Sequence, residues 1–130
     1  MTSPLRLLLV DDSASLRALL KQILTEQDFQ IVGEAATGTK ALALMAQHRP
    51  QIVCLDIELP DFNGLDLLAE IRLKYPATEV VMITGDSQKS TVQQAIRAGA
   101  RGYLVKPFKS QDVIQLLNKL SQYIQQKNQA

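Results

Sequence analysis

The chain has 130 residues, of which 46% are hydrophobic, and its 14 Lys and Arg side chains against 13 Asp and Glu give a formal net charge of +1. This length suits one domain over residues 1–130, and the balanced charge excludes binding to nucleic acid or an anionic membrane by bulk attraction. The N-terminus lacks a charged segment followed by a long apolar stretch, and no window approaches the roughly 20 apolar residues that a membrane span requires. We therefore predict a soluble cytoplasmic protein without membrane insertion.

Short continuous apolar runs alternate along the chain with longer stretches whose apolar residues recur with a period near 3.6. This alternation predicts five strands and five helices in strict order, with each strand followed by a helix. We expect the strands near residues 5–10, 30–34, 51–55, 79–84 and 101–105.

Two of the predicted helices carry clear apolar stripes that should face the sheet. The stripe of the first consists of Leu16, Leu19, Leu20, Ile23 and Leu24; the last helix begins near Ser110, and its stripe consists of Val113, Leu116, Leu117, Leu120 and Ile124. Residues that favour caps and turns separate the elements: Thr37-Gly38, Pro60 through Asn63-Gly64, Tyr75-Pro76, and Gly99 as the residue just past the end of the fourth helix.

Strands that alternate with helices form a parallel sheet, and right-handed crossovers place helices on both of its faces. The sequence therefore predicts a three-layer, doubly wound α/β domain. Ligands of such sheets bind at the carboxyl ends of the strands, near the point where the strand order reverses.

Polar residues stand at four of these strand ends. Asp11 and Asp12 follow the first apolar run, Asp56 the third, Thr84 ends the fourth, and Lys106 follows the fifth. Hard divalent cations take oxygen ligands, and a phosphoryl group takes cationic and hydroxyl partners. The combination predicts a switch that is phosphorylated in the presence of a metal ion.

Asp56 is the predicted nucleophile, because an aspartyl carboxylate can accept a phosphoryl group and form an acyl phosphate. Two carboxylates about 4 Å apart repel by about 4 kcal/mol at an effective dielectric near 20, so we expect a cation beside them. Asp12 and Asp56 would bind Mg²⁺ directly and Asp11 through water. Lys106 and the Thr84 hydroxyl would contact phosphoryl oxygens.

Each residue also has a purely structural interpretation. Asp12 or Ser13 could cap the first helix, Thr84 could merely end a strand, and Lys106 could be a solvated lysine. Cys54, the only cysteine, lies in an apolar run and reads as a small buried hydrophobe. The lone His48 has no metal-ligand spacing and receives no role in phosphotransfer.

The sequence resembles the receiver domains of bacterial two-component response regulators, and chemotaxis-type stand-alone receivers in particular. Four strings carry the resemblance over nearly the whole chain: residues 8–13 (LLVDDS), 56–64 (DIELPDFNG), 84–85 (TG) and 98–108 (AGARGYLVKPF). The resemblance implies the flavodoxin-like strand order 2-1-3-4-5. It further implies that a histidine kinase or phosphotransfer protein donates a phosphoryl group to Asp56. The bound ion would be Mg²⁺, or Mn²⁺, held by Asp12, Asp56 and the backbone carbonyl of Glu58.

The same resemblance assigns Thr84 and Tyr103 to an output switch that changes the surface of the fourth helix, fifth strand and fifth helix. It also implies a cis peptide before Pro107. We expect this surface, with Lys89, Gln93 and Arg97 on the fourth helix, to bind an unknown downstream protein, because little chain remains beyond the last helix for a nucleic-acid-binding domain.

Three other functions compete with a stand-alone signalling receiver that is not an enzyme but assists its own phosphorylation and dephosphorylation. A flavodoxin-like FMN carrier would need a hydroxyl- and glycine-rich loop where Asp11-Asp12 stands, and the chain has no tryptophan. An aspartyl phosphohydrolase would need a second aspartate two residues after Asp56, where Glu58 stands. The chain could also be the receiver portion of a longer regulator. Glu58 and Asp86, each two residues beyond a site residue, are expected to lengthen the lifetime of the acyl phosphate.

Overall fold

The computed structural model describes residues 3–129; Met1, Thr2 and Ala130, at the ends of the domain predicted over 1–130, lie outside the described residues. The described part contains five strands and five helices in strict alternation. The strands are β1 (Leu5–Val10), β2 (Phe29–Ala35), β3 (Ile52–Leu55), β4 (Glu79–Thr84) and β5 (Gly102–Val105). The helices are α1 (Ala14–Thr25), α2 (Gly38–His48), α3 (Gly64–Lys74), α4 (Lys89–Arg97) and α5 (Ser110–Gln129).

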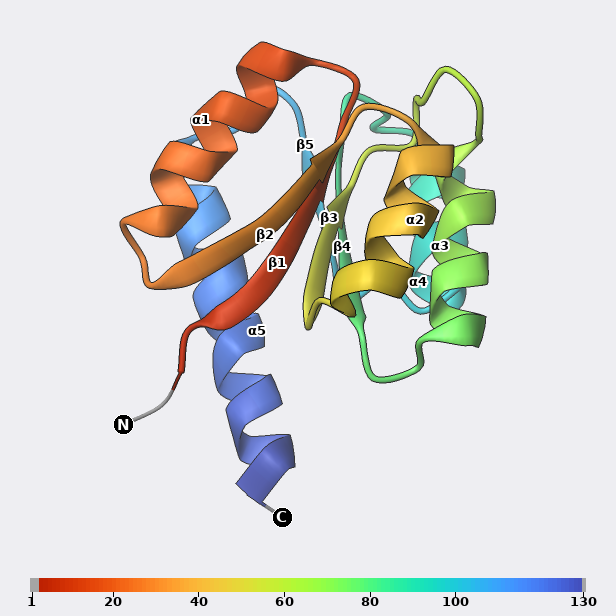
Figure 1. The fold of residues 1–130 in the computed structure, drawn as a ribbon. Coiled ribbons are helices and arrows are strands. Elements are labelled where there is room, and N and C mark those ends of the chain that lie inside the picture. The colour runs from red at the N-terminus through yellow and green to blue at the C-terminus, as the bar shows by residue number, and fades with distance from the viewer. Residues whose placement is uncertain (1–2, 130) are drawn as a thin grey trace.

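The strands form one parallel sheet in the order β2-β1-β3-β4-β5. Helices α1 and α5 cover one face, and α2, α3 and α4 cover the other (Figure 1). The predicted doubly wound three-layer fold and its strand order are confirmed. The chain reverses its strand order at β1 and β3, so their carboxyl ends border the crevice in which such sheets bind ligands.

Strand β1 shows why the apolar runs are continuous. Its side chains alternate between the faces, so Leu7 and Leu9 join the core under α1 and α5, whereas Leu8 and Val10 join the core under α2, α3 and α4. A strand buried on both faces has no polar side. The apolar runs thus reflect two separate cores.

The helix ends follow the predicted caps. The side chains of Ser13, Thr37 and Asn63 accept backbone N–H bonds at the starts of α1, α2 and α3. Gly99 follows the end of α4 with a φ of +106°, a left-handed conformation that glycine adopts without strain. Of the two candidate caps for α1, Ser13 is therefore the cap, and Asp12 stays exposed beside the carboxyl edge of the sheet.

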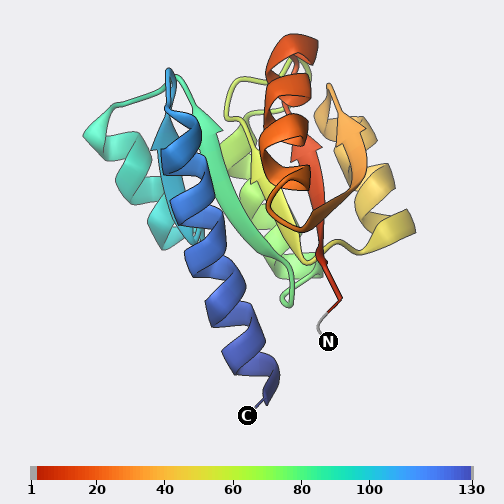
Figure 2. The same cartoon turned by 90° about the vertical axis from the view of Figure 1, so that its left-hand side faces the viewer.

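One detail of the predicted helices is wrong. Leu19 does not belong to the buried stripe of α1, because 44% of its surface is exposed beside the loop that links β5 to α5. Helix α5 continues to Gln129, past the end of its apolar stripe at Ile124, and its last turns project beyond the sheet (Figure 2). Among residues 3–129, no helix is long and apolar enough to cross a membrane.

Candidate functional site

Strand register brings the four polar positions together at the carboxyl edge of the sheet. Val10 pairs with Leu55, so Asp11 and Asp56 leave neighbouring strands at the same level. The pairing continues past the strands, since Asp56 N donates to Val10 O at 3.0 Å. Lys106 N donates likewise to Thr84 O at 2.8 Å. These bonds fix where each side chain starts.

Asp11, Asp12 and Asp56 form a carboxylate cluster in which one oxygen of each lies within 4.8 Å of the others. Asp11 and Asp56 are 3% and 5% exposed, whereas Asp12 is exposed. A buried carboxylate is costly unless charge or hydrogen bonds compensate it. Two buried carboxylates beside a third, exposed one therefore require positive charge nearby.

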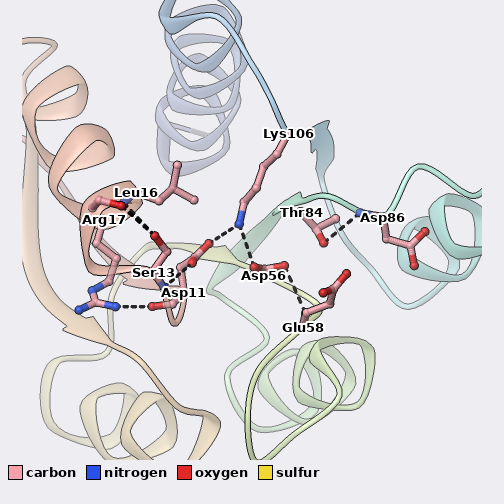
Figure 3. A network of polar contacts seen from close by, with 10 residues as sticks. Asp11, Ser13, Leu16, Arg17, Asp56, Glu58, Thr84, Asp86 and Lys106 are labelled. Carbon is pink, nitrogen blue, oxygen red and sulfur yellow. Dashed lines mark hydrogen bonds and ion pairs between the residues drawn. The ribbon is translucent and has the colours of Figure 1, made fainter.

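Lys106 supplies part of that charge (Figure 3). Its Nζ donates to Asp11 Oδ2 at 2.7 Å and to Asp56 Oδ2 at 2.9 Å. The other oxygens accept backbone bonds: Asp11 Oδ1 from Ser13 N at 2.9 Å, and Asp56 Oδ1 from Glu58 N at 3.2 Å. One ammonium thus bonds two of the three carboxylates, and the cluster keeps an excess of negative charge.

The pKa shifts agree with this incomplete compensation. Burial raises the pKa of Asp11 and the charge of Asp56 adds to the rise, while the hydrogen bond from Lys106 opposes it. Burial alone would lower the pKa of Lys106, but its bonds to Asp11 and Asp56 outweigh that effect and raise it. Lys106 is therefore charged at neutral pH, and the all-oxygen donor set around it fits a hard divalent cation such as Mg²⁺.

Thr84 and Tyr103 meet at the loop that follows β4. The Thr84 side chain is buried, and its Oγ1 accepts a long bond of 3.4 Å from Asp86 N. The Tyr103 hydroxyl donates to the backbone oxygen of Asp86 at 2.6 Å. The two residues predicted to form a switch thus both bond the backbone of Asp86.

The carboxylate of Asp86 is turned away from Asp56 (Figure 3). It accepts bonds from Gln88 N at 2.9 Å and from Thr91 Oγ1 at 3.1 Å, and so ties the loop after β4 to the first turn of α4. Glu58, by contrast, has an exposed side chain beside the site. The two flanking acids that looked alike in the sequence therefore have different surroundings.

One residue near the site was missed from the sequence. Arg17 donates to the backbone oxygen of Asp11 through Nη1, and its Nε bonds Glu34 Oε1 at 3.2 Å. Arg17 thereby holds the backbone that carries two of the three carboxylates. Its position one helical turn after the Ser13 cap was the available signal, because that spacing returns a side chain to the start of the helix.

Other residues singled out from the sequence lie outside the cluster. Cys54 is 2% exposed, and burial raises its pKa to about 12, so it behaves as the expected small hydrophobe. His48 ends α2 on the opposite edge of the sheet, where its carbonyl accepts a bond from Arg6. The Lys106–Pro107 peptide bond is cis, as the resemblance implied.

A five-stranded parallel sheet in this order, with buried carboxylates and a lysine at its carboxyl edge, defines the receiver class of signalling domains. The family model described as "Response regulator receiver domain" matches residues 7–118. The chain belongs to the response regulator receiver family, whose members work in phosphorelay signalling, and the flavodoxin-like electron carrier and hydrolase alternatives are set aside.

Among known proteins, the chain is similar to the chemotaxis protein CheY of Thermotoga maritima, with 38% identity over 89% of this chain and 97% of that protein. The transcriptional regulatory protein PdtaR of Mycobacterium tuberculosis is 40% identical over 85% of this chain but only 54% of its own length. A solved CheX–CheY–BeF₃–Mg²⁺ complex from Borrelia burgdorferi contains a similar chain, with a TM-score of 0.87, 31% identity, and coverage of 90% of this chain and 89% of that one.

Proposed function

We propose that Asp56 accepts a phosphoryl group from a phosphohistidine of a kinase or phosphotransfer protein. An oxygen of Asp56 attacks phosphorus, the nitrogen–phosphorus bond of the donor breaks, and an acyl phosphate forms. The observation that carries this proposal is the position of Lys106 Nζ, within 2.9 Å of Asp56 Oδ2 and 2.7 Å of Asp11 Oδ2. An ammonium placed beside the nucleophile can move from the carboxylate to an oxygen of the incoming phosphoryl group and stabilise its negative charge.

Asp11, Asp12, Asp56 and the backbone carbonyl of Glu58 would hold the ion, Mg²⁺ or Mn²⁺. The support is the all-oxygen donor set with its excess negative charge. A bound ion would neutralise charge on the phosphoryl oxygens. Asp12 is the exposed member of the cluster, which favours its role as a direct ligand of an ion that enters from solvent.

The Thr84 hydroxyl would donate to a phosphoryl oxygen on Asp56. Thr84 and Tyr103 both bond to Asp86, so a shift of Thr84 toward the phosphoryl group would be transmitted to the loop that leads into α4. The output surface would then be α4, β5 and α5. Its exposed side chains include Lys89, Gln93, Ile96, Arg97 and Val105, which suit a protein partner better than a nucleic acid.

We expect the donor protein to bind in a groove beside Lys106. A groove of about 370 Å³ between α1 and the loop after β5 is lined by Leu16, Leu19, Lys106, Pro107 and Phe108. Leu19, which is exposed rather than buried against the sheet, borders this groove. An apolar surface next to the nucleophile would let a donor bring its phosphohistidine to Asp56 without bulk charge attraction.

We propose further that the protein acts in the cytoplasm as a stand-alone receiver. It would be a switch that assists its own phosphorylation and dephosphorylation rather than an enzyme with external substrates. The support is its match to 97% of the Thermotoga maritima CheY, against 54% of the longer PdtaR. The mass of the protein in its native source tests the stand-alone part.

The deciding experiment is intact-mass measurement after incubation with a small acyl-phosphate donor, with Mg²⁺ or with excess chelator. We expect a gain of one phosphoryl group that needs Mg²⁺ and is lost in Asp56→Asn. Asp66→Asn, which removes an exposed carboxylate from the first turn of α3, is the matched control and should behave like the wild type. A gain in Asp56→Asn, or the same gain in chelator, would contradict the proposal.

A further inference from the structure

The loop between β3 and α3 is bound to the start of α2, a segment more than twenty residues away in the chain. Asp61 Oδ1 accepts a bond from Gly38 N at 2.7 Å. Asp61 Oδ2 accepts bonds from Thr39 N at 3.0 Å and from Thr39 Oγ1 at 2.7 Å. One exposed carboxylate therefore uses both oxygens to hold the first turn of another helix.

The residue after Asp61 makes a second contact with the same turn. A Cβ atom at Gly38 would lie 2.4 Å from Phe62 Cδ2 and 2.9 Å from Phe62 Cβ. The ring of Phe62 thus rests directly on the backbone of Gly38, where only glycine leaves it room. Asp61 and Phe62 together grip α2 by charge and by packing.

This loop also sets the position of Asp56. Glu58 N donates to Asp56 Oδ1 at 3.2 Å, opposite the oxygen that Lys106 holds. At the far end of the loop, Gly64 packs so tightly that a Cβ there would lie 2.3 Å from Asp56 O. Between these points Leu59 packs against the core and Gly64 N donates to Ile57 O at 2.7 Å, but Glu58, Pro60, Asp61 and Asn63 are all exposed. The contact with α2 is therefore what holds the exposed tip of the loop.

We propose that Asp61 is a positioning residue for the phosphorylation site. By its hydrogen bonds to the first turn of α2, it holds the loop so that Glu58 N keeps its hydrogen bond to Asp56 Oδ1. Asp61 does not touch Asp56 and acts through the loop. This inference rests on the proposed function, because it assumes that the carboxylate cluster binds a metal ion and that Asp56 is phosphorylated. Misplacing a group that orients a ligand carboxylate weakens metal binding.

A role as a simple helix cap makes a different prediction. Helix α2 already has a cap of its own, since Thr37 Oγ1 accepts a bond from Lys40 N at 3.1 Å. Thr37→Ala would remove that cap and leave the grip on the loop in place. Asp61→Ala would remove the grip and leave the local cap. The two variants therefore separate stabilisation of α2 from positioning of Asp56.

The test measures three quantities in wild type, Asp61→Ala, Asp61→Asn and Thr37→Ala: the urea midpoint in chelator, the Kd for Mg²⁺ by calorimetry, and the rate of phosphorylation by a small acyl-phosphate donor. We expect both alanine variants to lower the urea midpoint. We expect only the Asp61 variants to weaken Mg²⁺ binding and slow phosphorylation, by about tenfold, and to speed amide exchange at Glu58. Asp61→Asn, which keeps the shape of the side chain, serves if Asp61→Ala does not fold.

Asp66→Ala controls for the loss of one negative charge near the site and should leave the Mg²⁺ Kd unchanged. The inference is overturned if Asp61→Ala and Asp61→Asn bind Mg²⁺ and accept phosphate as the wild type does. It is also overturned if Thr37→Ala loses as much Mg²⁺ affinity and phosphorylation rate as the Asp61 variants do. A wild type that neither binds Mg²⁺ nor accepts phosphate would refute the proposed function instead. The two failures are therefore distinguishable.

Discussion

The two edges of the sheet carry opposite arrangements of charge. At the carboxyl edge, one lysine lies among three carboxylates. At the amino edge, one carboxylate, Glu79, lies among three cations and is 1% exposed. Its Oε1 lies 2.9 Å from Arg101 Nε and 3.3 Å from Arg72 Nη1, and its Oε2 lies 3.9 Å from Lys127 Nζ.

The two edges differ in the sign of the excess charge and in whether that charge is exposed to solvent or buried. The cations of the amino edge are partly exposed and sit in part at helix ends, as Arg72 does in the last turn of α3, where positive charge offsets the helix dipole. The charge of Glu79 is matched by these cations, although its buried Oε2 has no hydrogen-bond partner among the described residues. The carboxyl edge keeps uncompensated negative charge on buried groups, which a cation from solvent can neutralise. One edge therefore stabilises the fold, and the other keeps a capacity to bind.

The largest effect on stability should come from the amino edge. Glu79→Gln removes the charge that Arg72, Arg101 and Lys127 share, and we expect it to lower the free energy of unfolding by about 2 kcal/mol. This is below the loss for a fully buried pair, because the cations are partly exposed. Urea unfolding in chelator measures it. The Mg²⁺ affinity and phosphorylation of the folded protein should not change, and a loss of either would mean that the two edges are coupled.

The sequence predicted the carboxyl edge and missed the amino edge, and the reason is physical. Asp11, Asp56 and Lys106 follow directly on apolar runs, so strand order alone brings them together. The partners of Glu79 are Arg72 on α3, Arg101 just before β5 and Lys127 on α5, and these pairings depend on how far each helix extends and how it is rotated about its axis. The same holds for Asp61 and α2, because a loop and a helix start have no shared periodicity. Backbone architecture could be predicted from the sequence, but side-chain contacts between helices and loops could not.

An effect of the same size is expected for the single cation of the carboxyl edge. Lys106→Met leaves Asp11 and Asp56 buried with only backbone donors, and we expect it to lower the free energy of unfolding in chelator by about 2 kcal/mol. Added Mg²⁺ should restore more stability to this variant than to the wild type, because the cluster then has a larger excess of negative charge. Equal Mg²⁺ stabilisation of both proteins would contradict the comparison between the edges.

The pH dependence of that difference has a definite sign. Because the folded-state pKa of Lys106 lies above its ordinary value of 10.5, its stabilising contribution is complete below that value and is lost as the pH rises through the folded-state pKa. The difference in urea midpoint between wild type and Lys106→Met in chelator should persist at pH 9 and shrink above about pH 10.5. A difference that already disappears between pH 7 and pH 9 would show that Lys106 does not hold the carboxylates.

A smaller effect of opposite sign is expected for the nucleophile itself. Burial is the main cause of the raised pKa of Asp11, and Asp56→Asn removes the charge of Asp56 that adds to it. We expect the variant to be more stable than the wild type in chelator by about 1 kcal/mol, since a binding site keeps such repulsion at a cost to folding. Urea midpoints in chelator test this, and an equal or lower midpoint for Asp56→Asn would count against it. In Mg²⁺ the order should reverse, because the variant has lost a ligand.

The smallest effect separates two acids that the sequence presents as equivalent. Glu58 is exposed beside Asp56, whereas the Asp86 carboxylate is engaged by Gln88 N and Thr91 Oγ1 at the start of α4. Glu58→Asn should shorten the lifetime of the acyl phosphate by a few-fold, because it removes a negative charge that hinders the approach of water as a nucleophile. Asp86→Ala should lower the free energy of unfolding by about 1 kcal/mol through loss of its hydrogen bonds to Gln88 N and Thr91 Oγ1.

The measurement is the decay of the phosphorylated mass after the donor is removed, with urea midpoints taken alongside. Asp86→Ala should change the decay less than Glu58→Asn does, because its carboxylate points away from Asp56. If the acyl phosphate of both variants decays at the wild-type rate, neither acid controls the attack of water. The access of water to Asp56 must then be set by the groups that touch Asp56. If Asp86→Ala has the larger effect, the loop that joins Thr84 to Tyr103 controls the decay through the position of the Thr84 hydroxyl. In that case, the carboxyl edge would be tuned by its backbone as much as by its charge.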